Sequence, residues 1–198
     1  MAKADRRGPQ GLPVRLFKRG ADWTTWLKKH HATSRGLWLR LAKRHWGIIS
    51  VTYAEALDVA LCYGWIDGQG RRYDAASWLL KFTPRRPRSI WSKRNTQRAR
   101  ALIRAGRMKP SGLAAITTAK HTGRWQAAYD SPRAAVVPKD FQAALDRVAS
   151  AKAFFETLDR KNKYAIFFRV TTAKKADTRA RRIQQFVRML AARRVLHP

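Results

Sequence analysis

Acidic residues are scarce in this sequence of 198 residues. It carries 12 Asp and Glu against 43 Lys and Arg, so its formal net charge is +31 at pH 7 with histidine neutral. Such an excess attracts polyanions, because each phosphate that a cation neutralises releases counterions. It also opposes the direct capture of a cationic peptide, since like charges repel during the encounter. The expected partner is therefore anionic.

Cysteine is almost absent. Cys62 is the only one, which excludes an internal disulfide and a zinc site built on a Cys-x-x-Cys pair. It lies in an apolar run, where we expect it to pack as a small hydrophobic residue. The adjacent His30 and His31 would point about 100° apart on a helix and cannot chelate one metal together. We therefore expect no metal site and no cofactor.

Long apolar runs are missing too. No window approaches the ~18 uncharged apolar residues of a membrane span, and the basic N-terminus does not lead into the apolar stretch of a signal peptide. Together with the single cysteine, this predicts a cytoplasmic protein without a membrane span. The composition is 45% hydrophobic, with eight Trp, five Tyr and eight Phe, far more than a disordered polycation contains. The chain is expected to fold.

The order of the sequence patterns predicts an α+β fold, with helices packed on a small antiparallel sheet and a helical C-terminal module after them. We expect a flexible basic tail at residues 1–13, an α+β domain at 14–130, a linker at 131–137 and the helical module at 138–198. Glycine and proline mark the tail, and Pro132 and Pro138 mark the linker, because both residue types interrupt regular structure.

Capping residues followed by apolar periodicity predict helices that begin near Asp22, Thr52 and Ser89. The second of these has a glutamate three positions after its cap, as in a capping box. The apolar run at 36–42 predicts a buried strand, and residues 65–83 predict two strands joined by a glycine-containing turn.

The cations concentrate in residues 75–129, a stretch without any acidic residue. Near its start, arginine side chains and hydroxyl groups coincide with the free N–H groups of a predicted helix N-terminus, which favours an anion site. The candidate anion-binding residues are Arg85, Arg86, Arg88, Ser89, Ser92 and Asn95. Trp65 and Trp91 are candidates for an apolar wall, and Asp67 for orienting an arginine.

A purely structural interpretation stays open for the same residues. In it, Ser89 only caps a helix, Trp91 packs in the core and Asp67 satisfies the backbone of its own turn. The sequence contains no GxSxG, GxGxxG or GxxxxGK[ST] motif, and therefore lacks the usual nucleophile elbow and nucleotide-binding loops. No catalytic residue is assigned.

An ordered set of motifs resembles the YdeI/OmpD-associated family, also called bacteriocin-protection proteins. The motifs are ALCYGWIDG at 60–68, FTPRR at 82–86, SIWSKRN at 89–95, GRM at 106–108 followed by Gly112, and in the C-terminal part FF at 154–155 and TRARRI at 178–183. The resemblance extends from about Trp23 to Arg194. The chain is more basic than a typical member.

The resemblance implies an α+β part followed by a helical part, and an association with tolerance of bacteriocins or cationic antimicrobial peptides and with envelope stress. It assigns no catalytic residue. We therefore expect a non-enzymatic cytoplasmic stress-protection protein that binds an anionic small molecule or an acidic partner. Two alternatives stay open: an accessory protein that binds nucleic acid through nonspecific electrostatics, and an uncharacterised small-molecule enzyme. The sequence leaves the oligomeric state open.

Overall fold

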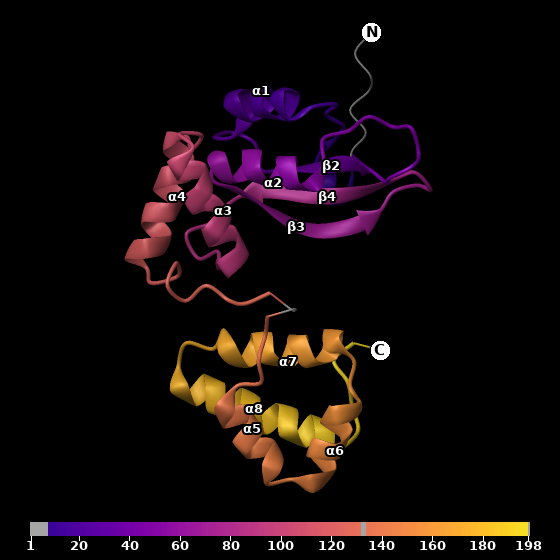
Figure 1. The fold of residues 1–198 in the computed structure, drawn as a ribbon, viewed down its shortest axis with the longest axis vertical. Coiled ribbons are helices and arrows are strands. Elements are labelled where there is room, and N and C mark those ends of the chain that lie inside the picture. The colour runs from indigo at the N-terminus through magenta and orange to yellow at the C-terminus, as the bar shows by residue number, and fades with distance from the viewer. Residues whose placement is uncertain (1–7, 132–133, 198) are drawn as a thin grey trace. The chain divides into compact units, whose positions relative to one another are not determined.

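The computed structural model describes residues 8–131 and 134–197. The chain divides into two compact units (Figure 1). The first unit comprises the chain up to Ser89 together with residues 95–126, and the second comprises residues 90–94 and the chain from Ala127 onward. The linker predicted at 131–137 lies within the second unit, and residues 132–133 of it are outside the described residues.

The first unit is built on a four-stranded sheet with the strand order β1-β2-β4-β3. Strand β1 pairs with β2 in parallel, whereas the other two pairings are antiparallel. This confirms the predicted α+β class, with a sheet that is mixed rather than purely antiparallel. The elements up to His121 are η1 (Pro9–Gly11), β1 (Val14–Arg15), α1 (Gly20–His30), β2 (Leu37–Ala42), α2 (Tyr53–Cys62), β3 (Trp65–Arg72), β4 (Ser77–Pro84), α3 (Lys93–Arg104) and α4 (Pro110–His121). The first two residues of α3 belong to the second unit.

An aromatic core joins α1 and α2 to the sheet. Trp23 of α1 is completely buried, and its indole Nε1 donates a hydrogen bond to the carbonyl oxygen of Ala56 in α2 at 3.1 Å. Its ring meets the rings of Trp65 in β3 and Phe82 in β4 edge to face, with centroids 6.1 and 5.7 Å apart. One side chain thus connects two helices and two strands, and both helices lie over the sheet (Figure 1).

Residues of the predicted tail contact Trp38 in β2. The Trp38 indole donates to the carbonyl oxygen of Pro9 at 3.0 Å, and its backbone N–H donates to that of Pro13 at 2.9 Å. Gly8 lies so close to the indole that a Cβ there would be 2.7 Å from the Trp38 Cδ1. Residues 8–13 therefore pack on the sheet, while residues 1–7 of the predicted tail lie outside the described residues.

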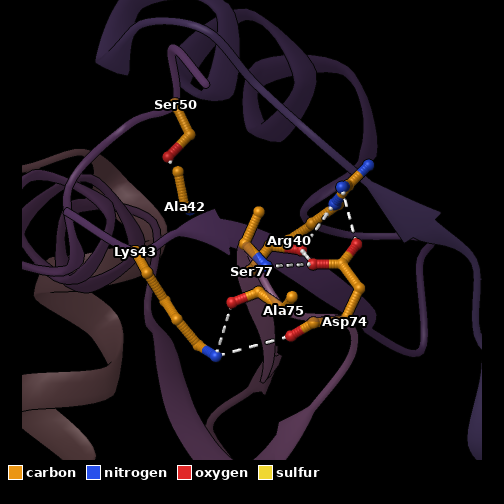
Figure 2. A network of polar contacts seen from close by, with 8 residues as sticks. Arg40, Ala42, Lys43, Ser50, Asp74, Ala75 and Ser77 are labelled. Carbon is orange, nitrogen blue, oxygen red and sulfur yellow. Dashed lines mark hydrogen bonds and ion pairs between the residues drawn. The ribbon is translucent and has the colours of Figure 1, made fainter. Parts of the chain in front are cut away.

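The predicted β-hairpin is present, but the predicted glycine-containing turn is wrong. Gly68 and Gly70 lie inside β3, and the chain reverses at residues 73–76. Asp74 holds this turn, since its carboxylate accepts from the Ser77 hydroxyl at 2.7 Å and from the backbone N–H of Ala76 at 3.0 Å (Figure 2). An aspartate that bonds the backbone two residues on replaces the glycine that was expected.

The helix predicted from the capping box is confirmed. The Thr52 hydroxyl accepts from the Glu55 backbone N–H at 3.3 Å, and the Glu55 carboxylate accepts from the Thr52 backbone N–H at 2.9 Å. The helix predicted to begin at Ser89 instead begins at Lys93. Ser89 is used in a turn, described below, and its hydroxyl does not cap α3.

The second unit contains four helices in its described C-terminal part: α5 (Lys139–Asp146), α6 (Ala149–Thr157), α7 (Arg160–Thr171) and α8 (Ala176–Ala191). Phe141, Phe155 and Phe167 meet in its core, together with aliphatic residues of α8. Asn162 accepts from the backbone N–H of Leu196 and His197, which attaches the chain end to α7. This confirms the predicted helical C-terminal module. No helix among the described residues is long and apolar enough to cross a membrane.

Gly112 is the point at which α4 meets the end of α2. A Cβ at this position would overlap the Cys62 carbonyl, 2.9 Å from its carbon, and the Met108 Cε at 2.8 Å. The same carbonyl oxygen accepts from the backbone N–H of Lys109 at 3.0 Å. Only glycine permits this approach, which also explains why Cys62 is buried.

We predict that Gly112→Ala destabilises the first unit by about 1–3 kcal/mol, because a rigid backbone carbonyl opposes the added methyl group. Gly20→Ala is the control, since a Cβ at Gly20 meets nothing within 4 Å. Urea unfolding of the two variants measures the difference. Equal midpoints would contradict the close packing of α4 on α2.

Candidate functional site

A hollow of about 730 Å³ opens in the first unit where β4 ends. It is lined by Gln10, Leu12, Arg35, Gly68, Gln69, Lys81, Thr83, Pro84, Arg85, Arg86, Pro87 and Ser89. Four of these residues are cationic, and no Asp or Glu is among the described residues that line it. Within the described residues, then, its wall carries charge of one sign.

Arg35 reaches the hollow because the chain passes very close to β4 at the next residue. Gly36 has a φ of +137°, and a Cβ there would lie 2.8 Å from the carbonyl oxygen of Phe82. The neighbouring Leu37 pairs with Phe82 in the sheet. Glycine therefore lets the segment before β2 cross the end of β4, and it places an exposed arginine beside residues almost fifty positions away.

A turn closed by Ser89 positions the two arginines that follow β4. The Arg85 backbone N–H donates to the carbonyl oxygen of Gly64 at 2.9 Å. The Arg86 backbone N–H donates to the Ser89 hydroxyl at 3.0 Å, and the Ser89 N–H donates to the Arg86 carbonyl oxygen at 2.9 Å. These bonds fix the backbone, while the Arg86 side chain is exposed to solvent.

A β-bulge forms another part of the wall. The pairing of β3 with β4 shifts register between Asp67 and Gly70, so that Gly68 and Gln69 together oppose Lys81. A bulge bends its strand and re-aims nearby side chains. The Lys81 ammonium donates to the side-chain oxygen of Gln10. The residues 8–12 that cover Trp38 thus also hold one of the four cations.

The nearest carboxylate in the sequence, Asp67, is occupied by a neutral partner. Its Oδ2 accepts from the Tyr53 hydroxyl at 2.9 Å, and it does not line the hollow. Other carboxylates pair with cations elsewhere in the chain: Asp22 with Arg19, Asp58 with Arg98, Asp74 with Arg40, Asp130 with Lys93, Asp140 with Arg179 and Asp146 with Lys152. The hollow is therefore a region of positive potential.

The structure brings together three of the six predicted anion-binding residues. Arg85, Arg86 and Ser89 line one hollow. Arg88 is exposed and does not line it, and Asn95 lies on α3. Ser92 belongs to the second unit, where it pairs with Tyr129. Their role in binding a ligand stays a prediction.

The predicted wall residues serve as core residues. Trp65 is 1% exposed, and its indole donates to the carbonyl oxygen of His31 at 3.1 Å. Trp91 is buried in the second unit. Arg35, Lys81 and Gln10 were missed as lining residues, because tertiary contacts bring them to the hollow from three separate segments. In the sequence, the glycine that follows Arg35 was the local feature that could have drawn attention to it.

A second hollow, of about 660 Å³, lies along α7 in the second unit. It is lined by Tyr164, Ala165 and Phe168 together with Arg160, Lys161, Arg169 and His197. The Tyr164 hydroxyl donates to the carbonyl oxygen of Asp130 at 3.0 Å, and burial raises the pKa of this hydroxyl. Three cations line this hollow, compared with four in the first, and aromatic or aliphatic side chains make up a larger share of its lining.

The comparisons divide the chain at nearly the same place as the fold. Residues 15–115, just over half of the chain, match the model of a domain of unknown function, DUF8412. Residues 134–193 match the model described as bacteriocin-protection, YdeI or OmpD-associated. This confirms the predicted family for the helical part, whereas the motif residues at 60–112 fall in the region of the other model. No curated protein and no solved structure matches the chain.

We predict that stability falls in acid because several carboxylates are hydrogen-bonded. Bonds from Ser77 hold the pKa of Asp74 below its ordinary value of 3.8, and bonds from Arg179 do so for Asp140. A lowered pKa in the folded state gives stability that is present above the ordinary value and lost as the pH falls through the folded value. The free energy of unfolding in urea should therefore decrease from about pH 5 to about pH 2.

The variant Asp74→Asn should show a shallower decrease, because it removes one of these groups. A wild-type profile that is flat over this range, or a profile with the same slope in the variant, would contradict the assigned role of the hydrogen-bonded carboxylates.

Proposed function

We propose that this protein has a protective function and that it exercises this function by binding an anionic ligand. The chain belongs to the DUF8412 family and carries a bacteriocin-protection, YdeI or OmpD-associated domain at residues 134–193. The ligand occupies the hollow at the end of β4. The protein acts by binding rather than by catalysis, and it acts in the cytoplasm.

The observation that carries the proposal is the set of four cations, Arg35, Lys81, Arg85 and Arg86, around one hollow without a described carboxylate in its lining. Arginine presents a planar group that binds a phosphate or carboxylate through two parallel hydrogen bonds. A hydrogen bond to a charged group contributes about 1.5–3 kcal/mol.

Protection by this protein is indirect. A chain with a net charge of +31 repels cationic peptides, so it does not act by sequestering them. An anionic metabolite or an acidic partner fits the charge of the hollow. Binding such a ligand lets the protein respond to a stress that alters the ligand's concentration.

The test uses inorganic pyrophosphate as the probe, titrated calorimetrically into the full chain at about 150 mM salt. The double variant Arg35→Gln/Arg86→Gln removes two exposed cations of the hollow, and we expect it to bind at least about tenfold more weakly, because one charged contact corresponds to about that factor. The control is Arg104→Gln/Arg107→Gln, which removes the same charge from exposed positions outside the hollow lining.

Equal weakening in both variants would overturn the proposed site, because it would show a response to net charge alone. No measurable binding by the wild type would also overturn it. The protective role is tested separately by the survival of bacteria that express each variant and are challenged with a cationic antimicrobial peptide. Only the hollow variant should lose protection.

A weaker, nonspecific affinity for nucleic acid accompanies this function in our proposal. In the described part of the first unit, α3 and α4 carry cations outside the hollow, and both Arg100 and Lys120 lie over the ring of Trp125. Titration of the wild type, the hollow variant and the control variant with duplex DNA distinguishes nonspecific binding of nucleic acid from binding of an anion in the hollow. The control variant should weaken DNA binding as much as the hollow variant does, with a steep dependence on salt.

A further inference from the structure

The loop between β2 and α2 is closed at its base and exposed at its tip. At the base, the backbone N–H of Ala42 donates to the Ser50 hydroxyl at 2.9 Å (Figure 2). Between these residues, His45 and Gly47 have φ values of +69° and +66°. The loop 43–49 is therefore a defined projection from the end of the sheet, held at both sides of its base.

The loop exposes two large apolar side chains. Trp46 is 54% exposed and Ile49 is 69% exposed. Trp46 is the one tryptophan among the exposed large hydrophobic residues of the described chain, whereas Trp23, Trp38 and Trp65 are fully buried. Two large exposed apolar side chains within four residues make this loop a candidate interaction site. Neither the hollow nor the core uses these two side chains.

The loop also carries cations. Lys43 and Arg44 precede Trp46 in the loop, and no acidic residue lies between Asp22 and Glu55. The Lys43 ammonium donates to the carbonyl oxygen of Ala75 at 2.8 Å, which attaches the loop to the hairpin turn at 73–76 (Figure 2).

The same end of the sheet carries two more exposed cations. They are Arg71 and Arg72, which lie at the end of β3, immediately before that turn. The nearby carboxylate of Asp74 is paired with Arg40 at 2.8 Å. The surface around the loop is therefore apolar and cationic together.

We propose that the loop 43–49 docks on an anionic lipid surface. The indole of Trp46 and the side chain of Ile49 enter the interface between headgroups and acyl chains, where tryptophan is favoured. Lys43, Arg44 and the arginines at the end of β3 contact lipid phosphates from outside. The apolar side chains and the cations are both needed, since either a short apolar loop or a few cations alone bind a membrane only weakly.

A lipid surface fits this loop better than a nucleic acid. Stacking on bases would use the indole, but it gives no reason for an aliphatic side chain as exposed as that of Ile49. Hydrocarbon accommodates both side chains. This proposal does not depend on anion binding in the hollow at the end of β4, so either proposal can be refuted without the other.

The test is co-sedimentation of the full chain with large vesicles of phosphatidylcholine that contain about one quarter phosphatidylglycerol, an anionic lipid. We expect Trp46→Ala/Ile49→Ala to lower the partition coefficient by about tenfold, because it removes the inserted apolar area. The net charge is unchanged, so general attraction of the polycation to the vesicles stays the same. Both side chains are exposed, and the urea midpoint should match that of the wild type.

The matched control is Ile103→Ala/Leu113→Ala, which removes two apolar side chains that are 40% and 43% exposed on α3 and α4. It should partition like the wild type. Equal partition of all three proteins, or no binding by the wild type, would overturn the proposal. So would a loss of self-association, or of binding to single-stranded DNA, in Trp46→Ala/Ile49→Ala while its vesicle binding is retained, since either result would assign the loop to another partner.

Discussion

The scarcity of carboxylates is the constraint on which the rest of the structure depends, because 12 acidic residues face 43 cations. Some of those in the described chain hold the backbone, and others pair with side chains. Glu55 completes the start of α2, Asp74 closes the hairpin turn, and Asp159 accepts from the Asn162 backbone N–H at the start of α7. Since these carboxylates serve the fold, the cations of the hollow attract an anion from solution.

Apolar packing stabilises the fold against the mutual repulsion of the many cations. Trp23 unites α1, α2, β3 and β4, and Gly112 lets α4 approach the end of α2 closely. The second unit has its own phenylalanine core. The charge is therefore carried by two folded scaffolds, and at the end of β4 the backbone of the cationic residues is fixed by hydrogen bonds. Because their backbone is fixed, these cationic residues form a defined site, which a disordered polycation does not have.

Local signals predicted the elements well and the hollow only in part. The capping box identified the start of α2 because all its contacts lie within four residues. The hairpin turn was misplaced because glycine in a bulge and glycine in a turn look alike in a sequence, and only the pairing with β4 separates them. Arg85 and Arg86 were recognised from the charge pattern, whereas Arg35 joins them through the passage of Gly36 beside Phe82, a contact between distant segments.

The central claim, that an anion binds at the end of β4, is tested most directly by following the Nε–Hε signals of all arginine side chains during titration with inorganic pyrophosphate. The account predicts that the signals of Arg35, Arg85 and Arg86 shift and saturate together, at concentrations that leave those of exposed arginines such as Arg104 and Arg188 unmoved. A proportionate shift of every arginine signal, without saturation at the hollow, would contradict it.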